Sequence, residues 1–256
     1  MQIDNSPPSS IWLIPPADLE LQSHQVDIWR AFLALSDNSM ELLKMTLSVD
    51  ENQRAARFHF QEDKDRFIAA HGCLRDILMR YLHCEPGQLG FSAGPYGKPC
   101  LSKNSFDPGL EFNLTHSGNY AMVAVTWQRK VGVDLEWIRP GISTEGIAGH
   151  YFSQREVSEL MALSSEQREV AFFKCWTRKE AYMKAVGLGL SLPLDSFDVS
   201  LNTTESAILR ATRPDPQEVA RWSLLSLEVD SGFASAVAVE GQGLEFRLWD
   251  WKMNWE

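Results

Sequence analysis

Alternation of apolar and polar residues predicts a β-strand over residues 131–137, VGVDLEW. Its odd-numbered residues are apolar and share one face, because side chains on a strand alternate with a period of two. Asp134 and Glu136 share the other face with Gly132. A half-buried strand ordinarily turns such a polar face to water, but two neighbouring carboxylates also suit a metal or acid–base site. A third residue from another part of the chain has to decide between these two interpretations.

The rest of the chain mixes helical and strand-like patterns. Apolar residues at intervals of three and four predict two helix-rich segments, residues 25–82 and 153–186. Shorter apolar runs bounded by turn residues predict strands within 11–14, 110–127 and 222–241. The second of these runs predicts two strands joined near Ser117-Gly118, and the third predicts a hairpin. This mixture predicts an α+β (mixed α/β) fold.

Two strand-like segments repeat each other. SGNYAMVAV at 117–125 and SGFASAVAV at 231–239 share Ser, Gly, Val, Ala and Val in register. Either the match is a coincidence between two apolar strands, or the chain is an internal duplication. A duplication divides it into an N-terminal half, 1–128, and a C-terminal half, 129–256. We expect the site in the cleft where the halves meet.

A predicted helix that starts near Phe172 supplies a candidate for the third acid. Glu180 and Lys184 are four residues apart and therefore lie on one helix face. The pair is either a surface ion pair of small energetic value or part of a site. Four basic residues of this helix predict a surface that meets anions and steers an acidic partner: Lys174, Arg178, Lys179 and Lys184.

A bound cation would allow the three acids to lie close together. If Glu180 approaches Asp134 and Glu136, their like charges repel unless a positive ion lies among them. Hard oxygen ligands favour Mg²⁺ over zinc, and Mg²⁺ commonly bridges carboxylates to substrate phosphates. The sequence therefore predicts a magnesium site for a phosphate-bearing substrate, with Lys184 offsetting the charge.

The composition of the chain limits the class of protein to which it can belong. The net charge of −10 argues against nucleic-acid and membrane surfaces as partners. Four cysteines without a metal-binding spacing suggest a reducing compartment, and the N-terminus resembles neither a signal peptide nor an anchor. We expect a cytoplasmic protein. Walker A, dinucleotide-binding and G-x-S-x-G motifs are missing from the sequence.

Three stretches of the chain resemble the signatures of Sfp-type 4′-phosphopantetheinyl transferases: FNLTHSG at 112–118, VGVDLEW at 131–137 and WTRKEAYMKAVGLGLSLPLDSF at 176–197. The segment YGKP at 96–99 is also similar to a family segment. The resemblance implies two similar halves around a pseudo-twofold axis and a monomer. It further implies Mg²⁺-dependent transfer of phosphopantetheine from coenzyme A to a serine of an apo acyl or peptidyl carrier protein. The second product is adenosine 3′,5′-bisphosphate, and such carriers serve fatty-acid, polyketide and nonribosomal-peptide synthesis.

The resemblance also assigns roles to residues at matching positions. The Mg²⁺ ligands are expected to be Asp134, Glu136 and Glu180, with Glu180 also a candidate base for the carrier serine and Lys184 stabilising the attacked phosphate. Coenzyme A is expected to meet His116 and Arg54 at its 3′-phosphate, Lys98 and Pro99 at its adenine and Thr115 at its pyrophosphate. Two positions depart from the family pattern, because Glu51 replaces a basic residue and Leu188 replaces a lysine.

Two other classes use the same residues differently. An Mg²⁺-dependent phosphate or nucleotide hydrolase would employ the acids with water as nucleophile. A non-catalytic module would hold carrier proteins and leave the acids solvated. Cleavage of coenzyme A without a carrier favours the first, and an absence of Mg²⁺-dependent coenzyme A binding favours the second.

Overall fold

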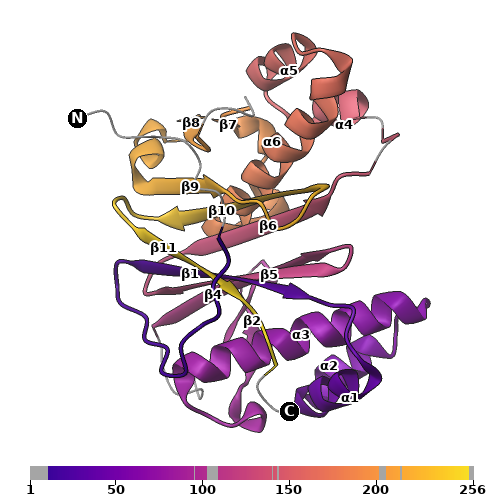
Figure 1. Ribbon diagram of the computed structural model, residues 1–256. Coiled ribbons are helices and arrows are strands. Elements are labelled where there is room, and N and C mark those ends of the chain that lie inside the picture. The colour runs from indigo at the N-terminus through magenta and orange to yellow at the C-terminus, as the bar shows by residue number, and fades with distance from the viewer. Residues whose placement is uncertain are drawn as a thin grey trace.

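The fold is α+β, as the sequence predicts, and is built on two main sheets with a long helix outside each (Figure 1); β2-β3 and β7-β8 form two small additional sheets. The computed structural model describes residues 11–94, 96–102, 109–139, 141–142, 144–201, 206–213 and 215–253. Within the described part of the chain, no helix is long and apolar enough to cross a membrane.

The N-terminal half contains three helices and five strands in the described residues. The helices are α1 (Asp37–Thr46), α2 (Val49–Ala55) and α3 (Gln61–Leu82). The strands are β1 (Gln25–Phe32), β2 (Phe91–Ala93), β3 (Pro99–Leu101), β4 (Leu110–Ser117) and β5 (Tyr120–Trp127). β4 and β5 form the predicted hairpin, which turns at Gly118 with a φ of 55°.

The C-terminal half repeats this plan. Its helices are α4 (Thr144–Tyr151), α5 (Gln154–Met161) and α6 (Ser165–Val186), the last of which ends at Gly187 in the left-handed conformation. Its strands are β6 (Val131–Trp137), β7 (Phe197–Val199), β8 (Leu209–Thr212), β9 (Trp222–Ser226), β10 (Phe233–Glu240) and β11 (Glu245–Asp250). β9 and β10 pair antiparallel, which confirms the second predicted hairpin.

Corresponding strands pair in the same order in the two halves. The first sheet runs β11-β1-β5-β4 and the second runs β6-β10-β9. In each half a first strand precedes a helix of 22 residues, α3 or α6, and then the two strands of a hairpin. The matching segments that the sequence displays are therefore the middle strands β5 and β10. β11 crosses back and pairs parallel with β1, so the C-terminal strand completes the sheet of the N-terminal half.

Three apolar layers hold the molecule together. One core lies between α3 and the first sheet, and a second lies between α6 and the second sheet. A third core fills the space between the two sheets, with Val26, Met122, Val133 and Val237 among its fully buried members. The order from bottom to top in Figure 1 is therefore helix, sheet, sheet, helix.

Two predictions about elements need correction. The segment at 25–32 is the strand β1 and not helix, because pairing on both sides buries it between β5 and β11. The run at 11–14 forms no strand beyond a single bridge from Leu13 to Trp249. The predicted helical segment at 153–186 is confirmed and consists of two helices, because Ser153 caps α5 and Ser164 is the N-cap of α6.

The prediction that four basic residues of α6 form a surface for anions is wrong for two of them. Arg178 is 1% exposed, and its guanidinium donates to the carbonyl of Ser200. Lys179 is fully buried, and its ammonium lies 2.7 Å from a carboxylate oxygen of Glu156. Buried cations are retained only when paired and hydrogen-bonded. These two residues therefore fasten α6 to its neighbours and are not available to steer a partner.

Candidate active site

The two strand acids face α6 and not bulk water. Val131, Val133 and Leu135 belong to the core between the sheets, so the alternation of β6 turns Asp134 and Glu136 to the other side. Asp134 is only 4% exposed. The interpretation of these residues as an ordinary solvated face is therefore excluded for Asp134.

Gly132 brings α6 close to these acids. A Cβ atom at this position would lie 2.1 Å from the carbonyl oxygen of Ala181 and 2.4 Å from the amide nitrogen of Ala185. Real Cβ atoms do not approach backbone so closely, so only glycine permits this helix–strand distance. The glycine of the G-x-D-x-E signature thus sets the separation between β6 and the residues of α6 that lie above it.

Lys184 joins α6 to the strand acids. Its ammonium nitrogen lies 2.5 Å from Oδ1 of Asp134 and 3.3 Å from the carbonyl oxygen of Val133. Thr115 of β4 stands beside this pair, with its hydroxyl 3.4 Å from the ammonium and 3.5 Å from Asp134 Oδ1. The structure therefore brings residues from β4, β6 and α6 together at one point.

The charges of the three acids are coupled. Burial raises the pKa of Asp134, and Lys184 offsets this rise only in part. Burial and the charge of Asp134 raise the pKa of Glu136. Burial, followed by Asp134 and with a smaller contribution from Glu136, raises the pKa of Glu180 to about 7. The charges of both strand acids therefore act on Glu180, and a metal ion shared by the three acids stays a prediction.

The donor set suits a hard divalent cation. It consists of carboxylate oxygens, and Oδ2 of Asp134 is buried without a hydrogen-bond partner among the described residues. A buried carboxylate oxygen without a hydrogen-bond partner lowers the stability of the folded protein unless a bound ligand interacts with it. Among the same residues, no three potential ligand side chains are gathered tightly enough to hold an ion as they stand. The ammonium of Lys184 supplies the compensating charge in this arrangement.

Basic side chains gather beside the acids. His116 follows Thr115 on β4 and is exposed. Desolvation lowers its pKa, and the nearby charges of His71, Lys184 and Arg66 lower it further. Arg66 and His71 lie on α3, and neither belongs to a sequence motif that marks a site residue. Their positions are evident only once α3 is packed beside β4.

Arg54 belongs to a stack on the same side of the molecule. Its guanidinium lies 5.2 Å from the centre of the Phe67 ring, and His71 stacks on that ring at 4.0 Å. Arg54 is itself exposed. Through this stack, Arg54 of α2 packs against α3, the helix that carries Arg66 and His71.

Glu51 has a structural role that explains its departure from the family pattern. Its carboxylate lies 2.7 Å from Arg75 and 3.1 Å from His71, and it caps α2 through the amide of Ser48. Burial raises the pKa of Glu51, but the hydrogen bonds from His71, Ser48 and Arg75 outweigh burial and lower it to about 2. Glu51 therefore ties α2 to α3.

Pro99 is the first residue of β3, and Lys98 directly precedes it. The ammonium of Lys98 donates to the carbonyl oxygen of Val131 at 2.7 Å, which ties this segment to the beginning of β6. Burial lowers the pKa of Lys98. The structure gives Lys98 a bridging role between the halves, and contact with adenine stays a prediction for both residues.

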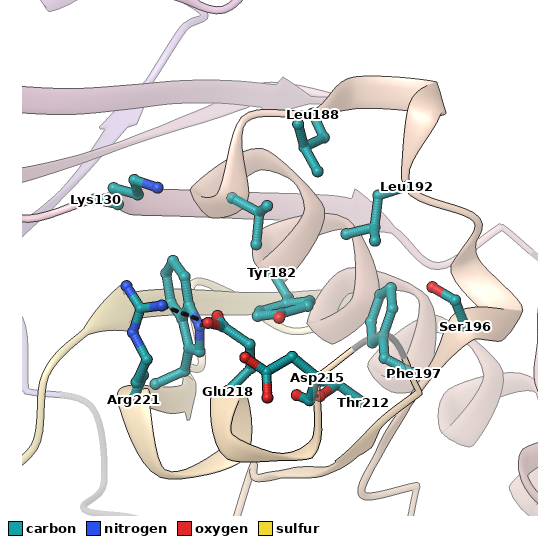
Figure 2. A pocket seen from close by; sticks show the side chains of 12 residues that line it. Lys130, Tyr182, Leu188, Leu192, Ser196, Phe197, Thr212, Asp215, Glu218 and Arg221 are labelled. Atoms are coloured by element: carbon teal, nitrogen blue, oxygen red, sulfur yellow. Dashed lines mark hydrogen bonds and ion pairs between the residues drawn. The ribbon is translucent and has the colours of Figure 1, made fainter.

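A cavity of about 310 Å³ lies against one face of α6 (Figure 2). Tyr182, Leu188 and Phe197 line it together with Glu218 and Arg221, which pair with each other. Tyr182 is two residues from Glu180 and from Lys184, which places it on the opposite face of the helix. The cavity is therefore separate from the acids, and Leu188 belongs to its wall.

Family models match both halves of the chain. A model described as "4'-phosphopantetheinyl transferase, N-terminal" matches residues 34–128, and one described as "4'-phosphopantetheinyl transferase superfamily" matches residues 130–238. The chain is similar to the solved holo-[acyl-carrier-protein] synthase of Helicobacter pylori in complex with coenzyme A only at a TM-score of 0.33 and 21% identity, covering 43% of this chain and 99% of the other.

Two curated relatives match most of the chain. The 4'-phosphopantetheinyl transferase HetI of Nostoc is 42% identical over 238 residues, which cover 93% of this chain and 97% of the relative. The 4'-phosphopantetheinyl transferase Sfp of Bacillus subtilis is 32% identical over 203 residues, which cover 79% of this chain and 86% of the relative. The chain therefore belongs to the 4′-phosphopantetheinyl transferase superfamily and is a transferase, which confirms the resemblance found in the sequence.

Proposed function

We propose that the protein transfers the 4′-phosphopantetheine group from coenzyme A to a serine of an apo acyl or peptidyl carrier protein. In this reaction the serine oxygen forms a bond to phosphorus, and the pyrophosphate P–O bond breaks. The serine proton passes to a base, and adenosine 3′,5′-bisphosphate leaves. The observation that carries the proposal is the coupling of Asp134, Glu136 and Glu180 beside Lys184, in a chain that belongs to this family.

Asp134, Glu136 and Glu180 would hold Mg²⁺. The orphaned Oδ2 of Asp134 and the purely carboxylate donor set support this assignment. When bound, Mg²⁺ supplies charge neutralisation and polarisation of a phosphoryl oxygen.

The side chains around the acids have separate roles in charge compensation, substrate contact and proton transfer. Lys184 offsets charge on the phosphate under attack, because its ammonium already lies among anionic groups. Thr115 lies next to it and meets the pyrophosphate. Glu180 accepts the serine proton directly or through a water. Phosphoryl transfer depends on such positioning and charge compensation more than on covalent catalysis.

The basic side chains on β4 and α3 receive the other end of coenzyme A. His116 and Arg66 meet the 3′-phosphate, since they lie close enough for their charges to interact. Arg54 assists from α2, and Lys98 and Pro99 flank the adenine. The reaction takes place in the cytoplasm, and the protein acts as a monomer.

The mass of the carrier tests the proposal. Apo carrier protein, coenzyme A and Mg²⁺ are incubated with the enzyme, and the carrier is weighed by mass spectrometry. We expect a phosphopantetheine adduct on one serine, lost in Asp134→Ala and retained in Gly149→Ala, an α4 glycine with open space around it. Cleavage of coenzyme A in the absence of carrier would favour the hydrolase. An adduct that forms equally well in Asp134→Ala would contradict the assignment of the acids.

A further inference from the structure

The edges of the two sheets meet along β4 and β6 without ordinary strand pairing. β4 is the last strand of one sheet and β6 the first of the other. The amide of Val133 donates to Oδ1 of Asn113 at 2.8 Å, and the amide of Trp137 donates to Oγ of Ser117 at 3.0 Å. Both contacts join residues 20 positions apart, so β4 and β6 run in the same direction with one constant register.

Lysine side chains satisfy the carbonyl groups on the same edge of β6. Lys98 donates to the carbonyl oxygen of Val131, and Lys184 donates to that of Val133. Backbone pairing would bring two strands to about 4.8 Å from each other. A side chain inserted between them holds them further apart, and Thr115 and Asp134 meet in the seam that this spacing leaves.

Ser117 also fixes one of the acids. Its hydroxyl already accepts the Trp137 amide proton, and its own proton points to Oε2 of Glu136 at 3.2 Å. A carboxylate can only accept in this contact, so the orientation of the hydroxyl and of Glu136 are set together. Gly118 follows Ser117 at the turn with a φ of 55°, and a Cβ there would lie 3.2 Å from the Phe233 ring.

We propose that Asn113 and Ser117 are positioning residues of the active site: their side chains replace main-chain pairing between β4 and β6, and Ser117 holds Glu136 in the orientation that binds the metal. This inference rests on the proposed function. Polar groups that orient metal ligands commonly contribute about 10-fold to 100-fold to metal affinity. Ser117 should therefore influence metal affinity without touching the metal.

The test measures Mn²⁺ binding by the loss of the free-ion electron paramagnetic resonance signal, with saturating coenzyme A and no carrier. Ser117→Ala removes both hydrogen bonds, Ser117→Thr keeps the hydroxyl, and Ser231→Ala alters the exposed serine at the matching turn of the second half. We expect Ser117→Ala to bind Mn²⁺ about 10-fold more weakly, Ser117→Thr to recover most of the affinity and Ser231→Ala to equal the wild type. Thermal unfolding of each variant confirms that it is folded.

Three results would overturn the inference, and the first two are distinguishable from the third. Unchanged Mn²⁺ affinity in Ser117→Ala, or equal losses in Ser117→Ala and Ser117→Thr, removes the positioning role and leaves the proposed function standing. Wild-type protein that binds no Mn²⁺ removes the metal assignment itself and the positioning role with it.

Discussion

The ammonium of Lys184 lies 2.5 Å from Oδ1 of Asp134 and is the counter-charge of a carboxylate that is almost completely buried. Removing one partner of such a pair leaves the other charge uncompensated, at a cost of about 3 kcal/mol or more. We therefore expect Lys184→Met to lower the free energy of unfolding by about 3 kcal/mol. Urea denaturation in the absence of divalent ions measures the change.

The double variant Lys184→Met with Asp134→Asn is the control for this prediction. It removes both charges, so it should be more stable than Lys184→Met alone. If the single and double variants lose the same stability, the two charges are not coupled in the folded protein.

Gly132 should not tolerate a side chain. Gly132→Ala places a Cβ against the carbonyl oxygen of Ala181, and backbone atoms of a helix can yield only if the helix moves. We expect a loss of about 2 kcal/mol or more of stability together with loss of transfer activity. The matched control, Gly149→Ala, should be neutral or slightly stabilising because alanine favours helix. Equal stability of the two variants would show that α6 does not approach β6 as described.

The lowered pKa of Glu51 predicts that the stability of the folded protein changes with pH. Its folded-state pKa of about 2 is below the ordinary value of 4.5. A depressed pKa contributes stability that is present above the unfolded-state value and is lost as the pH falls through about 4.5 towards 2. The difference corresponds to about 3 kcal/mol at neutral pH.

Comparison of wild type with Glu51→Gln isolates this contribution. Denaturation at pH 7 should favour the wild type by up to about 3 kcal/mol, and the difference should shrink below pH 4.5. A difference that is independent of pH would mean that the Glu51 charge is not what ties α2 to α3.

Arg66 gives a prediction about substrate recognition. If Arg66 acts with His116 on the 3′-phosphate, Arg66→Ala should raise the KM for coenzyme A about 10-fold, the effect of losing about 1.4 kcal/mol. The KM for dephospho-coenzyme A, which lacks this phosphate, should not change. Arg57→Ala is the control, since Arg57 is an exposed arginine just beyond α2. Equal effects on both substrates would place Arg66 elsewhere on coenzyme A.

Periodicity and motif spacing predicted the parts of the site that depend on local structure. The alternation of β6 places Asp134 and Glu136 on one face, and helical spacing places Glu180 and Lys184 on one face of α6. These relationships follow from the geometry of single elements. The repeat of SGNYAMVAV and SGFASAVAV likewise marks two strands that occupy matching places in the sheets.

Features that depend on packing between distant elements were not predicted. The sequence around Arg178 and Lys179 is basic, and only the contact with α5 and β9 reveals that both side chains are buried. β1 was predicted as helix because its partners, β5 and β11, lie about a hundred and two hundred residues away. Arg66 and His71 belong to an amphipathic helix whose sequence does not indicate that His116 lies beside it.

The most direct test of the account is the position of the metal in crystals grown with coenzyme A and Mn²⁺. Anomalous diffraction at the manganese edge locates the ion independently of any assumed ligands. The account predicts one ion among the carboxylates of Asp134, Glu136 and Glu180, with oxygen distances close to the value of about 2.1 Å that Mg²⁺ adopts. An ion bound elsewhere, or a Glu180 side chain turned away from the two strand acids, would contradict it.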